Sequence, residues 1–216
     1  MRRGELQVGR GTVALGVLAA ATTGAVVASE VGRVWRRGSA PLPAETDDLV
    51  GAAEEVVAET AEVVVTGYRE VSKRENALFN LLTAFVSTFI SARAITSLLR
   101  SRPSVGPFRD LAVGRRRIHH FVPGITLAFV SGAAAIVISD ESLGPKLAVP
   151  FGAGMGLTLD ESALLLELED VYWSEEGIVS VQIALATTAL LGALALGLRF
   201  LRRGEEEVLP PPPAGG

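Results

Sequence analysis

The sequence predicts an all-α fold, a polytopic transmembrane bundle of about five helices with one additional amphipathic helix. The composition is too apolar for an ordinary soluble domain of 216 residues, since 49% of the residues are hydrophobic and the mean hydropathy is +0.38. In addition, several apolar runs are long enough to cross a hydrocarbon core of about 30 Å, which needs roughly 20 helical residues. Both observations place the chain in a lipid bilayer.

The clearest apolar runs comprise residues 11–29, 77–99, 121–139 and 178–198. A further run, from Leu147 to about Leu168, is long enough only if the acids within it are tolerated. We count it as the fifth span because the segment 140–146 is short, which favours an antiparallel hairpin with the preceding run.

The first run has the features of a span and of a signal peptide. Arg2 and Arg3 precede it, and Val26, Val27 and Ala28 resemble a small-residue cleavage site. The apolar stretch is longer than the core of a typical signal peptide, so we expect a retained span.

Arginine density predicts the orientation. The basic residues on the two sides do not differ enough in number to decide it, but residues 100–117 crowd arginines beside two span ends, which favours the cytoplasm. We expect the N-terminus and this loop inside and residues 140–146 outside. The loop arginines are Arg100, Arg102, Arg109, Arg115, Arg116 and Arg117.

Residues 46–74 are predicted to form the amphipathic helix. Valine recurs every seven residues, at Val50, Val57, Val64 and Val71. We expect this valine face to be buried against the protein itself, on the membrane surface, or against a protein partner or second copy. Only Gly67 signals a turn before the next span, so one continuous rod is an open alternative.

The chain thus divides into four parts. They are an N-terminal transmembrane segment with a basic flank (1–38), the amphipathic helix (39–76), a four-span membrane core (77–203) and an acidic, proline-rich tail (204–216). We expect the tail to be disordered or polyproline-like.

The segment LTLDESALLLELEDVYWSEEG (157–177) concentrates negative charge that begins inside the fifth run. Gly152, Gly156, Asp160 and Glu167 follow one another at helical spacings and share one face. Glycines four residues apart let a neighbouring helix approach closely, so this face should pack against protein. The two acids then point into the bundle, where carboxylates have partners and often mark ion or proton paths.

The histidines form a second cluster. His119 and His120, in RRRIHHFVPG, lie at the start of the third span, on the same membrane side as the end of the fifth. Imidazoles and carboxylates together are a ligand set for a divalent metal and also an acid–base set for proton transfer. The hypothetical metal or ion site comprises His119, His120, Asp160, Glu161, Glu167 and Asp170.

Structural ion pairs are the alternative to this site. Arg115, Arg116 and Arg117 end the loop before the third span, and Arg93 lies near the inner end of the second. Each could balance an acid of the segment 157–177 without any catalysis.

Three classes of function fit these residues. An enzyme acting on a lipid-soluble substrate would hold a metal with one histidine, Glu167 and Asp170, and would use Asp160 or Glu161 as base. A transport component would use the same acids as ligands for a cation or proton. A scaffold would use helix 46–74 for partners and the charges for ion pairs.

Several other classes are excluded. The chain contains no cysteine, which rules out disulfides and thiolate chemistry. Its net charge of −4 and the lack of a basic stripe interleaved with aromatics argue against a nucleic-acid partner. The sequence also lacks the GxSxG, HExxH and P-loop motifs. The predicted environment is a bacterial or archaeal cell membrane, with the lipid bilayer as partner.

The motifs IHHFVPG, LTLDE and LEDVYWSEEG resemble those of a group of small multi-pass membrane proteins from actinobacteria and archaea. The resemblance covers roughly residues 75–200. It implies a membrane architecture and carries no catalytic role to any residue.

Overall fold

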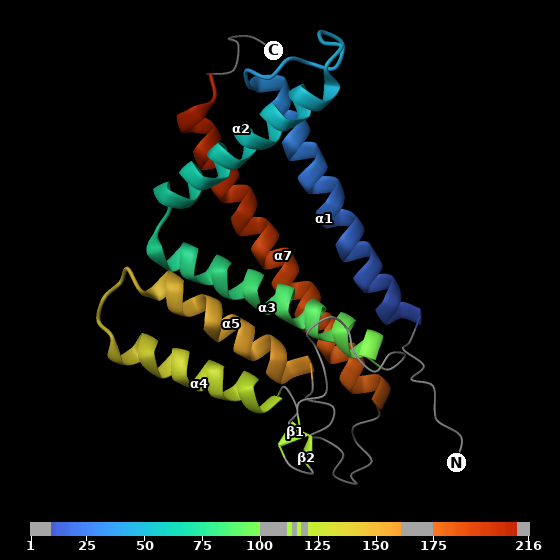
Figure 1. The fold of residues 1–216 in the computed structure, drawn as a ribbon, viewed down its shortest axis with the longest axis vertical. Helices are drawn as coiled ribbons and strands as arrows, with labels where there is room; N and C mark the ends of the chain where they lie inside the picture. Colours follow the sequence, from blue (N-terminus) through green and yellow to red (C-terminus); the bar gives the residue numbers. More distant parts are fainter. Residues whose placement is uncertain (1–9, 100–111, 114–115, 118–120, 161–174, 211–216) are drawn as a thin grey trace.

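The computed structural model describes residues 10–99, 112–113, 116–117, 121–160 and 175–210. The regular secondary structure of this part of the chain is helical apart from one short hairpin, which confirms the all-α class (Figure 1). In the hairpin, β1 (Ala112–Val113) pairs antiparallel with β2 (Arg116–Arg117). The helices are α1 (Arg10–Arg37), α2 (Leu49–Glu70), α3 (Lys73–Leu99), α4 (Phe121–Val137), α5 (Gly144–Asp160) and α7 (Glu175–Val208).

Three of the described helices are long and apolar enough to cross a membrane. They are residues Ala14–Arg37 of α1, Lys73–Ile95 of α3 and Gln182–Val208 of α7. The helices α4 and α5 have 17 residues each, which corresponds to about 25 Å. The part of the predicted fifth span that follows Asp160 lies outside the described residues.

The long helix α7 packs on α1, α2 and α3 (Figure 1). The helix α3 runs antiparallel to α7, so that Phe79 near its start packs on Phe200 and Arg93 near its end meets Gln182. The helix α5 packs on α3, and α4 packs on α5. At the C-terminal end of α7, α1 lies alongside it and α2 crosses it.

Glycines bring the backbones of α3, α5 and α4 into contact. A Cβ on Gly152 would overlap the Leu81 carbonyl of α3, and one on Gly156 would lie 2.8 Å from the Phe85 oxygen. Gly154 faces the opposite way, where a Cβ would lie 2.6 Å from the Gly124 oxygen of α4. The prediction that the Gly152–Gly156 face packs against protein is therefore confirmed, and its partner is α3.

A second close contact holds α2 on α7. A Cβ on Gly67 would overlap the Phe200 carbonyl, and one on Gly204 would overlap the Val63 carbonyl. Beside this crossing a buried apolar cluster joins α1, α2 and the end of α7, formed by Val34, Val63, Leu201 and Leu209.

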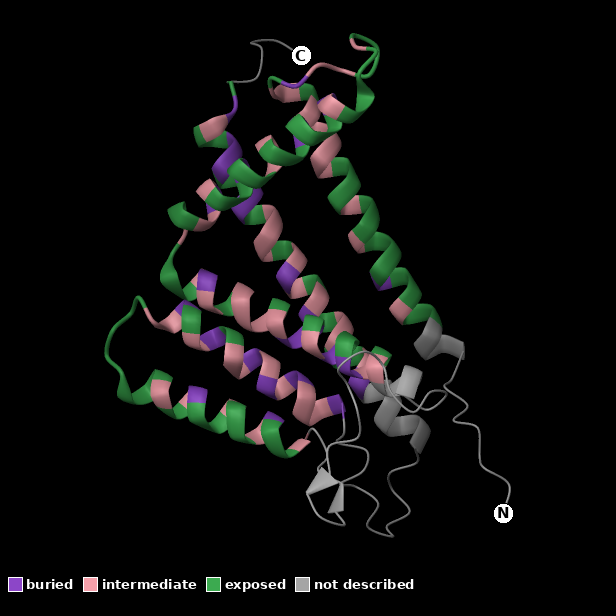
Figure 2. Ribbon diagram, in the orientation of Figure 1, coloured by how far each residue is buried: buried purple, intermediate pink, exposed green. Residues whose placement is uncertain are grey.

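Exposed residues cover the outer faces of the bundle (Figure 2), and many of them are large and apolar. On α4, Phe129 is 73% exposed and Ile136 is 87% exposed. Patches of this kind on a soluble monomer would be an aggregation hazard, whereas lipid covers them in a membrane protein.

Of the three positions predicted for the valine face of α2, burial against the protein itself is wrong. Contact with a membrane surface or with a partner stays a prediction. Val50 is 72% exposed and Val57 is 65% exposed, while Val56 and Val63 are buried. The buried face is set by Gly67, whose lack of a side chain lets α2 approach α7. Val56 and Val63 lie on the same side of α2 as Gly67 and therefore face α7. The predicted valine face is shifted by one residue, to Val57 and Val64, and so points away from α7.

The alternative of a single rod from the amphipathic helix to the next span is also wrong. The chain leaves the helix at Val71 and starts again at Lys73, with Ser72 as the capping residue. Ser72 Oγ accepts a hydrogen bond from Glu75 N at 3.3 Å, and Ser72 N donates to Glu75 Oε2 at 3.1 Å. This reciprocal pair is a capping box, which the sequence signals as Ser-x-x-Glu.

The predicted tail begins too early. Residues 204–208 are the last turns of α7, and Glu205 and Leu209 are buried against α1 and α2. The excess of charge in this stretch suggested solvent exposure, but the charge of Glu205 is balanced by arginines of α1.

The turn between α4 and α5 contains a small polar motif. Ser142 N donates to Asp140 Oδ1 at 2.8 Å. Hydrogen bonds from Ser142 lower the pKa of Asp140, and the charge of Lys146 lowers it further. The turn is thereby fixed at the end of the α4–α5 hairpin.

The crossing of α2 and α7 predicts a large effect of one methyl group. Gly67→Ala should destabilise the protein by about 1–3 kcal/mol, because the added Cβ meets backbone and not a flexible side chain. Gly24→Ala in α1 is the control, since a Cβ there has no neighbour within 4 Å. Thermal unfolding in detergent measures both, and equal stability of the two variants would contradict the close contact.

Candidate functional site

A polar cluster joins α3, α5 and α7 at one end of the helical core. Arg93 of α3 pairs with Asp160 of α5, with 2.7 Å between Nε and Oδ1. The Arg93 guanidinium also donates through Nη2 to Gln182 Oε1 of α7 at 2.7 Å. Asp160 and Gln182 are buried, being 6% and 3% exposed.

Gln182 completes the cluster through its amide nitrogen. Its Nε2 donates to the carbonyl oxygen of Leu159 at 2.6 Å and to that of Asp160 at 3.3 Å. Arg93 Nη2 donates to the Asp160 oxygen as well, at 3.2 Å. Donors from α3 and α7 thus converge on the last described turn of α5.

The place of this cluster follows from the packing of α5 on α3. Asp160 lies four residues after Gly156 and therefore on the same face, toward α3. Arg93 lies four residues after Phe89, whose ring lies 5.8 Å from the guanidinium carbon. The backbone contact at Gly156 brings these two helices close enough for the ion pair.

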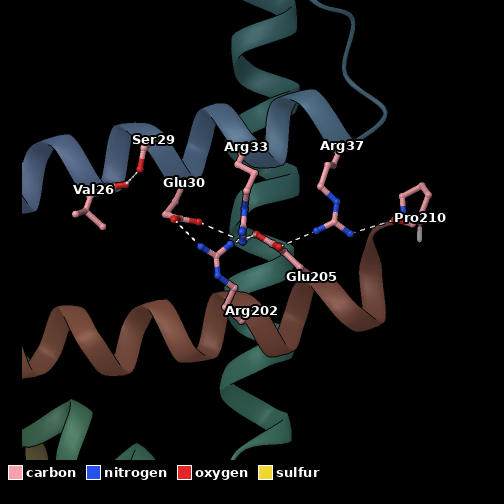
Figure 3. A network of polar contacts seen from close by, with 8 residues as sticks. All are labelled: Val26, Ser29, Glu30, Arg33, Arg37, Arg202, Glu205 and Pro210. Atoms are coloured by element: carbon pink, nitrogen blue, oxygen red, sulfur yellow. Dashed lines mark hydrogen bonds and ion pairs between the residues drawn. The ribbon is translucent and has the colours of Figure 1, made fainter. Parts of the chain in front are cut away.

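A second polar cluster joins α1 to the C-terminal end of α7 (Figure 3). Glu205 is only 2% exposed and pairs with Arg33 and with Arg37, the latter at 2.9 Å. Glu30 pairs with Arg202 at 2.8 Å and with Arg33 at 3.2 Å. Acids and arginines of both helices therefore alternate across this contact.

Arginine supplies the cation in both clusters. Each buried carboxylate has a guanidinium as its immediate neighbour. An arrangement of this kind holds helices in register, and removing one partner leaves an uncompensated charge.

An apolar groove of about 610 Å³ lies between α4 and α5. Its walls include Phe129, Gly132 and Phe151, and its one hydroxyl, on Thr158, is bonded to the Gly154 carbonyl of its own helix. Ligand sites position substrates with a few polar groups, which this groove lacks.

Most residues of the hypothetical metal site lie outside the described residues. This applies to His119, His120, Glu161, Glu167 and Asp170, and also to Arg115 and the side chains of Arg116 and Arg117. The structure does place Asp160 and Arg93, and it brings them together. Across the part of the chain that the structure describes, no three histidine or acidic residues come together as metal ligands.

Sequence reasoning overlooked Gln182 and the whole Glu205 cluster. The signal for Gln182 was its position as a lone amide in the apolar run 178–198. For the other cluster, Glu30, Arg33 and Arg37 recur at helical spacing at the end of α1, which indicates one charged face.

Comparisons with protein-family models, with curated proteins and with solved structures find no match to this chain. The function must therefore be argued from its own geometry.

The Glu205 cluster predicts unequal effects of two adjacent glutamates. Glu205→Gln should destabilise the protein by about 1–3 kcal/mol, because Arg37 loses its carboxylate partner and Arg33 keeps only Glu30. Glu206→Gln is the matched control, since the side chains of Glu206 and its partner Arg203 are both mostly exposed and such a pair contributes about 0–1 kcal/mol. Urea unfolding in detergent micelles compares the two, and equal midpoints would show that Glu205 has no structural role.

Proposed function

We propose that this protein is a five-span scaffold of a bacterial or archaeal cell membrane, whose buried charges join helices. The observation that carries the proposal is the Arg93–Asp160–Gln182 network, in which donors on two helices satisfy the acid and carbonyls of a third. Asp160 is the described acid of the hypothetical ion site, and its charge is already balanced.

Helix directions support five crossings. The helix α1 runs parallel to α7, as Gly16 approaches Ile183 and Arg33 pairs with Glu205. The helix α3 is antiparallel to α7, α5 is parallel to α3, and α4 is antiparallel to α5. The directions of α1, α3, α4, α5 and α7 thus alternate along the chain. The 17-residue helices would cross through local thinning of the bilayer or through continuation beyond their described ends.

The positions of the charges favour a scaffold over a transport path. Gln182 and Glu205 mark the two clusters and lie 23 positions apart in α7, about 35 Å along the helix axis. That distance is close to the thickness of the hydrocarbon core, about 30 Å. The clusters would then lie at the two membrane boundaries, whereas binding sites of secondary transporters lie near the midplane.

A mutant cycle tests the scaffold. Arg93→Gln should destabilise the protein by about 3–5 kcal/mol, because the buried Asp160 carboxylate loses its counter-ion. Asp160→Asn should cost about 1–3 kcal/mol, because the Arg93 side chain is 39% exposed and keeps its hydrogen bond to Gln182. The double variant should lose less than the sum, with a coupling energy of about 0.5–3 kcal/mol. Arg199→Gln is the control, since its side chain is 65% exposed and pairs with Glu75 at the surface. Denaturant unfolding of purified protein gives all four values.

The metal-site alternative gives the opposite result in the same experiment. If Asp160 were a ligand together with His119 or His120, the purified protein would contain a divalent metal and Asp160→Asn would lose it without losing stability. Metal content by mass spectrometry, measured beside the unfolding curves, separates the two functions.

The orientation is tested with reporter fusions. A fusion at Gly106 should report the cytoplasm and one at Gly144 the opposite side, because arginines crowd residues 100–117. Phosphatase and fluorescent-protein fusions at both positions measure it. Cytoplasmic signals at both points would rule out the five-span arrangement.

A further inference from the structure

The surface of α2 divides into three sectors around the helix. One sector is buried and comprises Ala52, Val56, Val63 and Gly67, of which Val63 and Gly67 meet α7. The next sector is apolar but exposed, and it comprises Val50, Ala53, Val57 and Val64. The third sector is exposed and carries the charged residues Glu54, Glu55, Glu62 and Arg69, with Val65 among them.

Tyr68 shows where the exposed apolar sector points. At 100° per residue, Tyr68 lies on the same side of α2 as Val57 and Val64. Its hydroxyl accepts a hydrogen bond from Asn80 Nδ2 at 2.8 Å, and its ring meets that of Phe200 edge-on at 5.8 Å. Asn80 belongs to the membrane-crossing part of α3. Val57 and Val64 therefore lie on the side of α2 that faces the membrane-crossing part of the bundle.

The charged sector points away from the membrane-crossing part of the bundle. Its glutamates give it a negative charge, which an anionic lipid surface would repel. The helix α2 also crosses α7 near the end of the span, where the chain becomes rich in charge (Figure 1). Its long axis thus follows the membrane boundary while α1 and α7 cross it.

We infer that α2 is an interfacial helix whose exposed sector, Val50, Ala53, Val57 and Val64, contacts the lipid surface on the side where α1 and α7 end. This inference rests on the proposed membrane topology. The face suits lipid because it is continuous with the Tyr68 contact to α3 and because its valines and alanines provide a shallow apolar strip opposite a charged one. The protein itself leaves this strip uncovered, and of the positions that the sequence predicted for it we choose the membrane surface.

Spin labels test the inference directly, because a chain without cysteine accepts single-cysteine variants. Val57→Cys and Val64→Cys would carry a nitroxide on the apolar sector, and Glu55→Cys and Glu62→Cys would carry one on the charged sector. All four side chains are exposed, so the substitutions preserve the packing on α7. The full chain is reconstituted in vesicles of phosphatidylethanolamine and phosphatidylglycerol.

The readout is power saturation with oxygen, which partitions into lipid, and with a water-soluble nickel complex. The ratio of oxygen to nickel accessibility should be several-fold higher at the valine positions than at the glutamate positions. Equal ratios on the two sectors would overturn the inference. Valine positions shielded from both reagents would also overturn it, because a second copy of the chain or another protein would then cover the face.

A label at Val130→Cys separates this failure from a failure of the topology. Val130 is 64% exposed on α4, in the helix proposed to cross the bilayer. A lipid signal at Val130 with a water signal at Val57 would overturn the interfacial helix alone. A water signal at Val130 would overturn the five-span arrangement itself.

Discussion

The backbone contact between α3 and α5 at Gly152 and Gly156 is the constraint on which the helical core depends. A side chain at either position would force the helices apart, because the nearest atoms are backbone atoms of α3. The same face of α5 carries Asp160 one turn later, so close packing necessarily buries this acid. Arg93 and Gln182 then satisfy it and the carbonyls beside it from the two neighbouring helices. The close packing of α5 on α3 and the ion pair of Asp160 thus both arise from the α5 face that carries Gly152, Gly156 and Asp160.

A glycine contact and ion pairs also occur together at the other end of the molecule, between α1, α2 and α7. Gly67 and Gly204 let α2 lie directly on α7, and this draws the charged end of α7 against α1. Glu205 is buried there, and the guanidinium groups of Arg33 and Arg37 offset the cost of its desolvation. In both clusters, glycine contacts and ion pairs depend on one another, because the charges are tolerated only where the helices meet.

Between the clusters, residues 183–198 of α7 carry no charge. This part of the helix packs through Ala189 on Phe85 and Val86 of α3. The outer faces of the bundle, by contrast, expose large apolar side chains, which only a lipid environment covers at low cost. The bundle is apolar outside, and its buried acids Asp160 and Glu205 are paired with arginines at the two ends, which resists separation of the helices. The exposed apolar face of α2 adds to this apolar surface.

Local patterns in the sequence were enough to identify the helices, because apolar runs, capping residues and glycine spacing act within one or two turns. They also indicated that Gly152, Gly156 and Asp160 share a packed face, since that depends only on helical periodicity. They could not decide which valines of α2 are buried, because periodicity gives two adjacent stripes and only the contact of Gly67 with α7 selects between them. Nor could they pair Glu205 with Arg33 and Arg37, which lie about 170 positions away in the chain and meet only because α1 and α7 run side by side. What the sequence by itself determined is therefore a set of apolar helices and the faces on which they can pack. Only the tertiary structure decided which face meets which neighbour and which charge each buried acid receives, because those choices depend on atoms brought together from distant parts of the chain.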